Sequence, residues 1–141
     1  MPKLLLFVPC DKVIVDETTH SISIVDVLQE LHYKLPPGVS VQPKSLLPVK
    51  WAALSLWQEE EPADSGLEFE QRLSVENQSG DVLLLNETKW KFEKPNHRIV
   101  ANAMGLPVAR RLVLKLSYRV IGMPNWLPAG SFPIELFQDV L

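Results

Sequence analysis

Residues 67–76 read Leu-Glu-Phe-Glu-Gln-Arg-Leu-Ser-Val-Glu, and this stretch decides the fold class of the chain. Its odd-numbered residues are mostly apolar, whereas its even-numbered residues are charged or carry a hydroxyl group. Successive side chains of a β-strand point to opposite faces of a sheet, so the alternation predicts a strand with one buried face. Helical spacing does not account for the same pattern.

The same period of two recurs at residues 88–92 and 112–120. Shorter runs, rich in branched or aromatic residues and bounded by turn-forming sequence, predict further strands. These are Leu4–Val8, Lys12–Asp16, Ala52–Trp57, Arg98–Met104 and Phe132–Leu136. The chain has 12 prolines, which fit poorly inside helices and central strands. We therefore expect about eight or nine strands and little helix.

Residues 24–35 are ambiguous between strand and helix. Ser21 to Ile24 alternate as in a strand, whereas the spacing of four other positions is helical: Ile24, Leu28, Leu31 and Leu35. Prolines then bracket residues 36–48, which we expect to carry the chain from one sheet to the other, with a mobile loop as the alternative.

Short strands without a βαβ rhythm favour one domain, residues 1–141, built as a mainly antiparallel two-sheet β-sandwich of the Ig-like or C2-like kind. A partly closed β-barrel is the alternative. Apolar residues make up 46% of the chain and charged residues 22%, which indicates a packed core rather than disorder.

Cys10 is the only cysteine, so the chain can form no internal disulfide, and a reducing cytoplasm is the expected compartment. The apolar run Leu4–Val8 is too short for a secretion signal, and Pro9 is unsuitable at a cleavage site. No stretch is apolar enough for a membrane span, and we expect no membrane association.

Enzyme signatures are absent from the sequence, which has only 6 glycines and none of the phosphate-binding or nucleophile-elbow motifs. His20, His32 and His97 are far apart and form no ligand cluster, so we expect no metal and no cofactor. Cys10 follows an apolar strand and is predicted to be a packed thiol. An unrecognised enzyme using Cys10 or His97 is the third reading, after two kinds of noncatalytic binding protein.

Acidic residues are densest at 59–70, which makes a calcium-binding loop one alternative. Basic residues interleave with Trp90 and Phe92, as in single-strand nucleic-acid binders. If the lysines face solvent, however, the aromatic rings face the core, so we expect no nucleic acid as partner.

Charge is divided along the chain. Residues 1–88 carry 6 basic and 14 acidic side chains, a net charge of −8, and residues 89–141 carry 8 basic and 3 acidic, a net charge of +5. Opposite charges favour head-to-tail association, so the leading prediction is a noncatalytic interaction module that binds a protein partner or itself. Exposed edge strands would add backbone pairing, and the predicted contact residues are Glu59, Glu60, Glu61, Arg110 and Arg111.

The alternative function is binding of a small ligand, a carbohydrate or calcium, by loops at one end of the sandwich. Exposed aromatic rings can stack on sugars, and basic side chains can hold polar groups. The candidate residues are Trp57, Trp126, His97 and Arg98.

Four stretches of the sequence carry a family resemblance. They are residues 3–16, 54–57, 69–72 and 97–119, and the last contains His97-Arg98, Gly105-Leu106-Pro107-Val108 and Leu114–Arg119. Together they resemble an uncharacterised family of small bacterial single-domain proteins. The resemblance implies a β-rich fold and a bacterial cytoplasmic setting. It implies no activity and no site residue.

Overall fold

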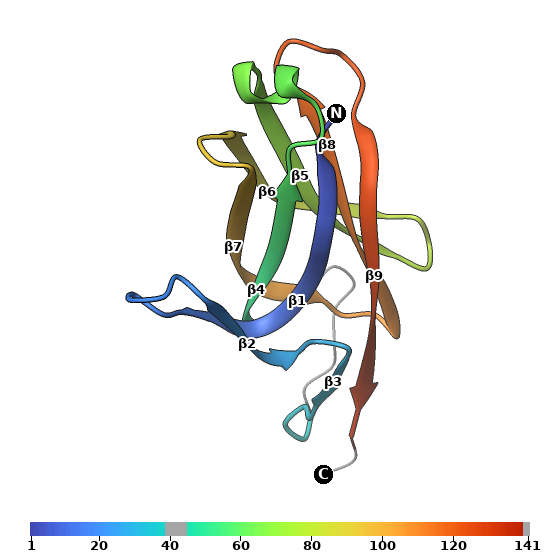
Figure 1. Cartoon of the computed structure of the whole chain (residues 1–141). Coiled ribbons are helices and arrows are strands. Elements are labelled where there is room, and N and C mark those ends of the chain that lie inside the picture. Colours follow the sequence, from blue (N-terminus) through green and yellow to red (C-terminus); the bar gives the residue numbers. More distant parts are fainter. Residues whose placement is uncertain (39–44, 140–141) are drawn as a thin grey trace.

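The computed structural model describes residues 1–38 and 45–139, which form nine β-strands in two packed sheets (Figure 1). Sheet A has the order β2-β1-β4-β7 and sheet B the order β3-β9-β8-β5-β6. All neighbouring strands are antiparallel except β3 and β9, which are parallel. The prediction of a mainly β, two-sheet sandwich is therefore confirmed.

The strands of sheet A are β1 (Lys3–Val15), β2 (Ile22–Val27), β4 (Leu46–Gln58) and β7 (Asn96–Pro107). Those of sheet B are β3 (Glu30–Tyr33), β5 (Glu68–Asn77), β6 (Val82–Lys91), β8 (Arg111–Val120) and β9 (Leu127–Gln138). A short 3-10 helix, η1 (Pro62–Gly66), joins β4 to β5. No helix in residues 1–38 or 45–139 is long and apolar enough to span a membrane.

Two predicted strands, Leu4–Val8 and Lys12–Asp16, are one strand in the structure. β1 runs through Pro9, whose fixed φ suits extended backbone. The carbonyl oxygen of Pro9 accepts a hydrogen bond from the backbone N–H of Leu28 at 2.8 Å. The prediction of two separate strands here is therefore wrong.

The ambiguous residues 24–35 form strands, because they contain β2, β3 and the step between the two sheets. Leu28 and Leu31 pack against the core as the chain leaves sheet A and joins sheet B, which accounts for their helical spacing. The predicted crossover does join β3 in sheet B to β4 in sheet A. Leu46–Pro48 belong to β4, however, and residues 39–44 of the predicted connection lie outside the described residues.

Large apolar side chains fill the space between the two sheets. Trp57 and Trp90 stack with ring centroids 5.1 Å apart, and Phe69 lies 5.2 Å from Trp90. Trp90 also lies parallel to the His97 ring, 6.3 Å away, which brings the ends of β6 and β7 together. Aromatic rings of this size supply much of the apolar surface that a small domain buries.

Candidate binding surfaces

The outer face of sheet A is apolar, like its inner face. Directly opposed residues of antiparallel strands share a face, and three rows cross β1, β4 and β7 on the side away from the core. The rows are Leu6–Leu56–Arg98, Val8–Leu54–Val100 and Cys10–Ala52–Asn102. None of these side chains belongs to the core cluster between the sheets.

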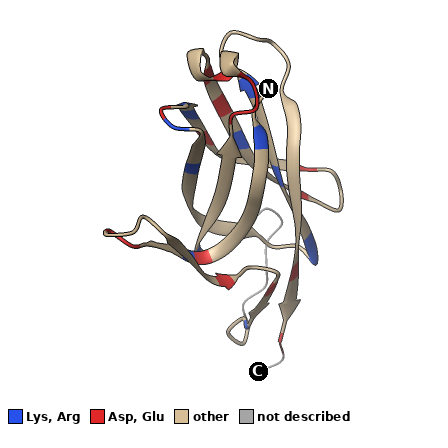
Figure 2. Ribbon diagram, in the orientation of Figure 1, with Lys and Arg blue, Asp and Glu red and all other residues tan. Residues whose placement is uncertain are grey.

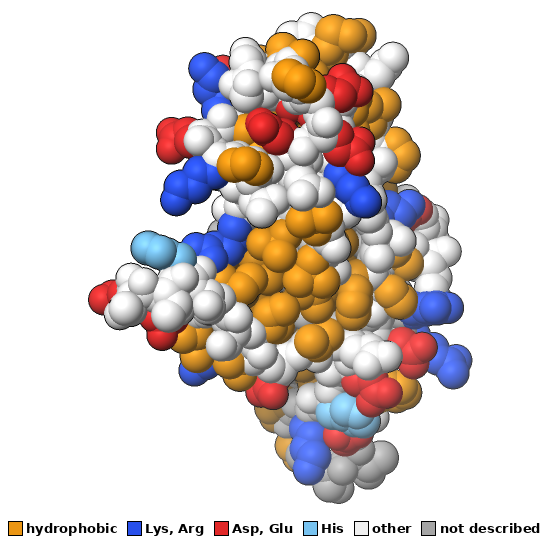
Figure 3. Space-filling view, in the orientation of Figure 1, with side chains coloured by type: hydrophobic (Ala, Val, Ile, Leu, Met, Phe, Trp, Pro, Cys, Tyr) orange, Lys and Arg blue, Asp and Glu red, His pale blue; other side chains and the backbone are white. Residues whose placement is uncertain are grey.

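Figure 3 shows this outer face as a central apolar area over β1 and β4, with charged side chains around it. Val8, Cys10, Ala52 and Leu54 are at most 6% exposed, although they point away from the core. Leu6 and other residues at the margin are over a third exposed. We call this surface, formed by the three rows and by Leu5, the sheet A face.

A hollow of about 500 Å³ opens on the sheet A face. Its floor contains Leu5 and Leu56, and its polar residues come from the β1–β2 turn and from the start of β7. Arg98 Nη1 donates a hydrogen bond to the carbonyl oxygen of His20 at 3.2 Å. Since β7 and β2 are opposite edges of sheet A, this contact requires the sheet to curl and makes the hollow concave.

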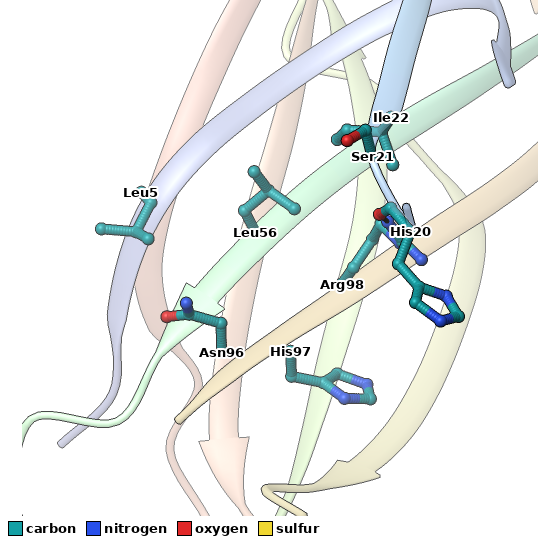
Figure 4. Close-up of a pocket in the computed structure, with 8 residues that line it drawn as sticks. All are labelled: Leu5, His20, Ser21, Ile22, Leu56, Asn96, His97 and Arg98. Carbon is teal, nitrogen blue, oxygen red and sulfur yellow. Dashed lines mark hydrogen bonds between the residues drawn. The ribbon is translucent and has the colours of Figure 1, made fainter. Parts of the chain in front are cut away.

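Two predicted ligand residues, His97 and Arg98, line this hollow, but their side chains differ in direction (Figure 4). The His97 ring points away from Leu5 and Leu56 and stacks on Trp90. Burial lowers the pKa of His97, although the Glu93 carboxylate acts in the opposite direction. Arg98 is the one Lys, Arg, Asp or Glu side chain among the described residues that line the hollow.

A second hollow, of about 620 Å³, lies where the two sheets separate beside the start of β6. Leu46, Pro107 and Val108 line it from the sheet A side, and Val75 and Leu83 from sheet B. Among the strands that the structure describes, β6 pairs only with β5, so its other side is an edge. The apolar residues Val82, Leu83 and Leu84 there are 63%, 38% and 50% exposed, and we call them the β6 edge.

The predicted charged contact residues lie at opposite ends of the sandwich. Glu59, Glu60 and Glu61 precede η1, whereas Arg110 and Arg111 lie at the end of β8 that is far from η1 (Figure 2). Arg111 is opposite Glu135 in the β8–β9 register. The structure therefore does not bring these five residues together.

The two oppositely charged halves of the sequence also interleave in the fold. Sheet A places β7 beside β4, and sheet B places β8 between β5 and β9. Ion pairs join the halves directly, since Arg119 binds Glu70 and Lys115 binds Glu76. The charge division in the sequence is therefore not a charge division of the surface.

The two tryptophans of the predicted ligand set lie in different environments. Trp57 is 0% exposed and packs in the core, so a ligand-stacking role for it is wrong. Trp126 is partly exposed, and its ring contacts two guanidinium groups, with the Cζ atoms of Arg72 and Arg119 at 4.1 and 4.2 Å from its centroid. These cation–π contacts occupy part of the ring surface that a sugar would use.

The acidic residues 59–70 are not arranged around a common centre. The carboxylate of Asp64 is buried and accepts the backbone N–H groups of Glu60 and Glu61, whereas Glu70 binds Arg119. Within the described part of the chain, no group of three or more His, Cys, Asp or Glu side chains is placed to hold a metal ion. The calcium alternative therefore has no assembled site in these residues.

Cys10 is buried on the sheet A face, and burial, followed by the Asp11 charge, raises the pKa of its thiol. A nucleophilic cysteine needs the opposite shift, toward the thiolate. Its environment is that of the packed thiol that the sequence predicts.

No family model matches the chain, and no curated protein matches it. The resemblance to an uncharacterised bacterial family remains a prediction.

Sequence reasoning missed both apolar surfaces. A signal for the first is the run Trp51–Trp57, in which six of seven residues are apolar, because a strand buried on one face only would alternate. A signal for the second is Val82–Leu85, four consecutive apolar residues at the start of a strand.

Proposed function

We propose that the chain is a noncatalytic protein-interaction module that pairs through the β6 edge, with a second copy of itself as the partner. The observation that carries this proposal is an exposed apolar strand edge beside an open hollow between the two sheets. The single cysteine supports a reducing, cytoplasmic setting for such a module.

The geometry of the β6 edge suits the addition of a strand. Leu83 lies opposite Val75, and Val82 and Leu83 both line the hollow, whereas Leu84 lies opposite Ser74 and does not line it. A strand added beside β6 would place alternate side chains toward the hollow and over Leu84 on the other face. Backbone hydrogen bonds would supply affinity, and the hollow would select side chains.

A second copy fits this edge by symmetry. Two β6 edges paired antiparallel about a two-fold axis present the same donors, acceptors and apolar side chains to each other. Natural edge strands usually carry charges or proline that prevent such pairing. Lys89 and Lys91 occupy the far half of β6, but the half from Val82 to Leu85 has no charged residue.

Light scattering over a range of protein concentrations tests the proposal. We expect a molar mass that rises above 16.0 kDa and that persists between about 50 and about 500 mM salt, because backbone and apolar contacts are little screened. Assembly steered by the charged ends would instead weaken at high salt.

Leu84→Lys is the decisive variant, since a charge on an edge strand opposes pairing. Ile14→Lys is the matched control, because Ile14 is 49% exposed and Leu84 50%. We expect Leu84→Lys to be monomeric and Ile14→Lys to assemble as the parent does. A parent chain that stays monomeric at every concentration would contradict self-pairing.

A further inference from the structure

The hollow on the sheet A face has the lining of an anion site. Of its described lining residues, none is acidic. Arg98 and the Asn96 amide supply N–H donors, and the Ser21 hydroxyl adds an O–H donor. Its apolar residues Leu5 and Leu56 make the same hollow suitable for a hydrocarbon group.

Arg98 has unused binding capacity in this hollow. Among the described residues it forms no ion pair, although Arg72 and Arg119 each bind a glutamate. Its contact with the His20 carbonyl uses Nη1, and a guanidinium has five N–H donors. That contact also holds the guanidinium at the wall of the hollow. Anion binding would therefore immobilise few further rotatable bonds of the Arg98 side chain.

Apolar surface continues away from Arg98 across the sheet A face. Leu56 lies between Leu6 and Arg98 in the strand register, and the next row is Val8–Leu54–Val100. Leu5 and Leu6 are 46% and 37% exposed beside it. A cation at one end of an apolar surface matches a ligand with an anion at one end of an apolar chain.

We propose that the sheet A face binds a small amphipathic carboxylic acid, with its carboxylate on Arg98 and its hydrocarbon chain on Leu5, Leu6 and Leu56. This site is separate from the β6 edge and does not depend on self-pairing. The β1–β2 turn stands over the hollow through the His20–Arg98 contact, so the surface is concave. A concave surface accepts a narrow ligand and does not pack against an identical concave surface of a second copy.

Titration of the parent protein with octanoate, followed by backbone amide NMR, tests the site. We expect saturable shifts centred on Leu5, Ser21, Leu56 and Arg98. 1-Octanol and octylammonium also contain eight carbons but have no carboxylate, and we expect each to bind at least about tenfold more weakly, because a charge-assisted pair is lost. Equal binding of octanoate and 1-octanol would overturn the carboxylate assignment.

Substitution of Arg98 provides the second test. Arg98→Gln should weaken octanoate binding by about tenfold or more, and Arg98→Lys should weaken it less because the charge remains. Arg111→Gln changes the net charge equally at a distant position and should leave binding unchanged. If Arg98→Gln does not fold, the comparison of octanoate, 1-octanol and octylammonium binding to the parent protein still tests the carboxylate assignment.

Two further results would also overturn the proposal. The first is the absence of saturable octanoate shifts at millimolar concentrations. The second is loss of those shifts as protein concentration rises, in step with a molar mass above 16.0 kDa, since the face would then be covered by a second copy.

Discussion

The indole Nε1 of Trp57 on β4 donates a hydrogen bond to the side-chain Oε1 of Gln71 on β5, at 3.0 Å. The hydroxyl of Ser55 donates to the same oxygen at 2.9 Å. All three residues are at most 2% exposed. One amide oxygen therefore satisfies two buried donors and joins the inner faces of the two sheets.

Gln71→Leu tests this junction, because it keeps an apolar side chain of similar size but leaves the Trp57 and Ser55 donors without their acceptor. Each of the two buried unsatisfied groups costs about 1–3 kcal/mol, so we expect the free energy of unfolding to fall by roughly 2–6 kcal/mol. Urea denaturation measures the loss. Ser55→Ala removes one donor and leaves the acceptor paired with Trp57, so its expected cost is only about 1 kcal/mol. Equal losses in the two variants would contradict the shared role of Gln71.

The face of Gln71 could be predicted from the sequence, but its partners could not. In residues 67–76 the alternation places Gln71 on the same side as Phe69 and Leu73, and the structure confirms this. The residues across the core depend on how β4 packs over β5, and alternation carries no information about packing between sheets. For this reason the sequence leaves Trp57 among the candidate ligand residues, although it lies in the core.

The candidate sites were less predictable than the fold for a related reason. The residue type of Arg98 makes it a candidate for ligand binding, and the structure does place it in a hollow. The neighbours that give the hollow its chemistry, Leu5, Leu56 and Ser21, come from β1, β4 and the β1–β2 turn. Only the strand register and the curl of sheet A bring these residues together.

Asp64 should stabilise the start of η1 in a pH-dependent way. Burial raises the pKa of Asp64, but the backbone N–H groups of Glu61 and Glu60, together with the amino group of Met1, outweigh burial and hold the pKa below 3.8. The stabilisation is therefore complete above the ordinary pKa of an aspartate and is lost as pH falls through the lower folded-state pKa. Thermal unfolding between pH 7 and pH 2 should show this loss.

Asp64→Asn is the corresponding variant. We expect it to lower the free energy of unfolding by about 1 kcal/mol at neutral pH, because the amide oxygen can still accept backbone N–H groups but the charge that strengthens these bonds is lost, and to reduce the acid-dependent change. Glu68→Gln is the control, since Glu68 is an exposed carboxylate close in sequence. If acid lowers the stability of Asp64→Asn as much as that of the parent, the acid-dependent loss of stability comes from groups other than Asp64.

Trp126 should stabilise the fold through its contacts on the outer face of sheet B. Its ring contacts the guanidinium groups of Arg72 and Arg119, and these bind Glu87 and Glu70 respectively. Trp126→Ala removes two cation–π contacts of about 0.5–1 kcal/mol each. We expect chemical denaturation to give a loss of about 1–2 kcal/mol. Trp126→Phe retains a ring and should lose less, whereas equal losses would assign the effect to packing of the indole alone.

His32 should make the β3–β9 pairing sensitive to pH. Hydrogen bonds to Asp139 first and then to Glu30 raise the pKa of His32 above its ordinary value of 6.5. Nδ1 of the ring lies 3.1 Å from Asp139 Oδ1, and Nε2 lies 3.4 Å from Glu30 Oε2. The ring also stacks on Phe137, with the two ring centroids 5.0 Å apart. A raised pKa means that the stabilisation is complete below 6.5 and is lost as pH rises through the folded-state pKa.

NMR titration of the His32 ring should therefore give a pKa above 6.5 in the parent, and a value closer to 6.5 in Asp139→Asn. Glu30→Gln should produce a smaller decrease, because Glu30 is the weaker partner. In the parent, amide hydrogen exchange in β3 should become faster, relative to the intrinsic rate, as pH passes through the measured pKa. β3 is only four residues long and parallel to its neighbour, so few backbone hydrogen bonds compensate for the lost charge. If the relative exchange rate does not change across that pH range, His32 titrates without holding β3 in place.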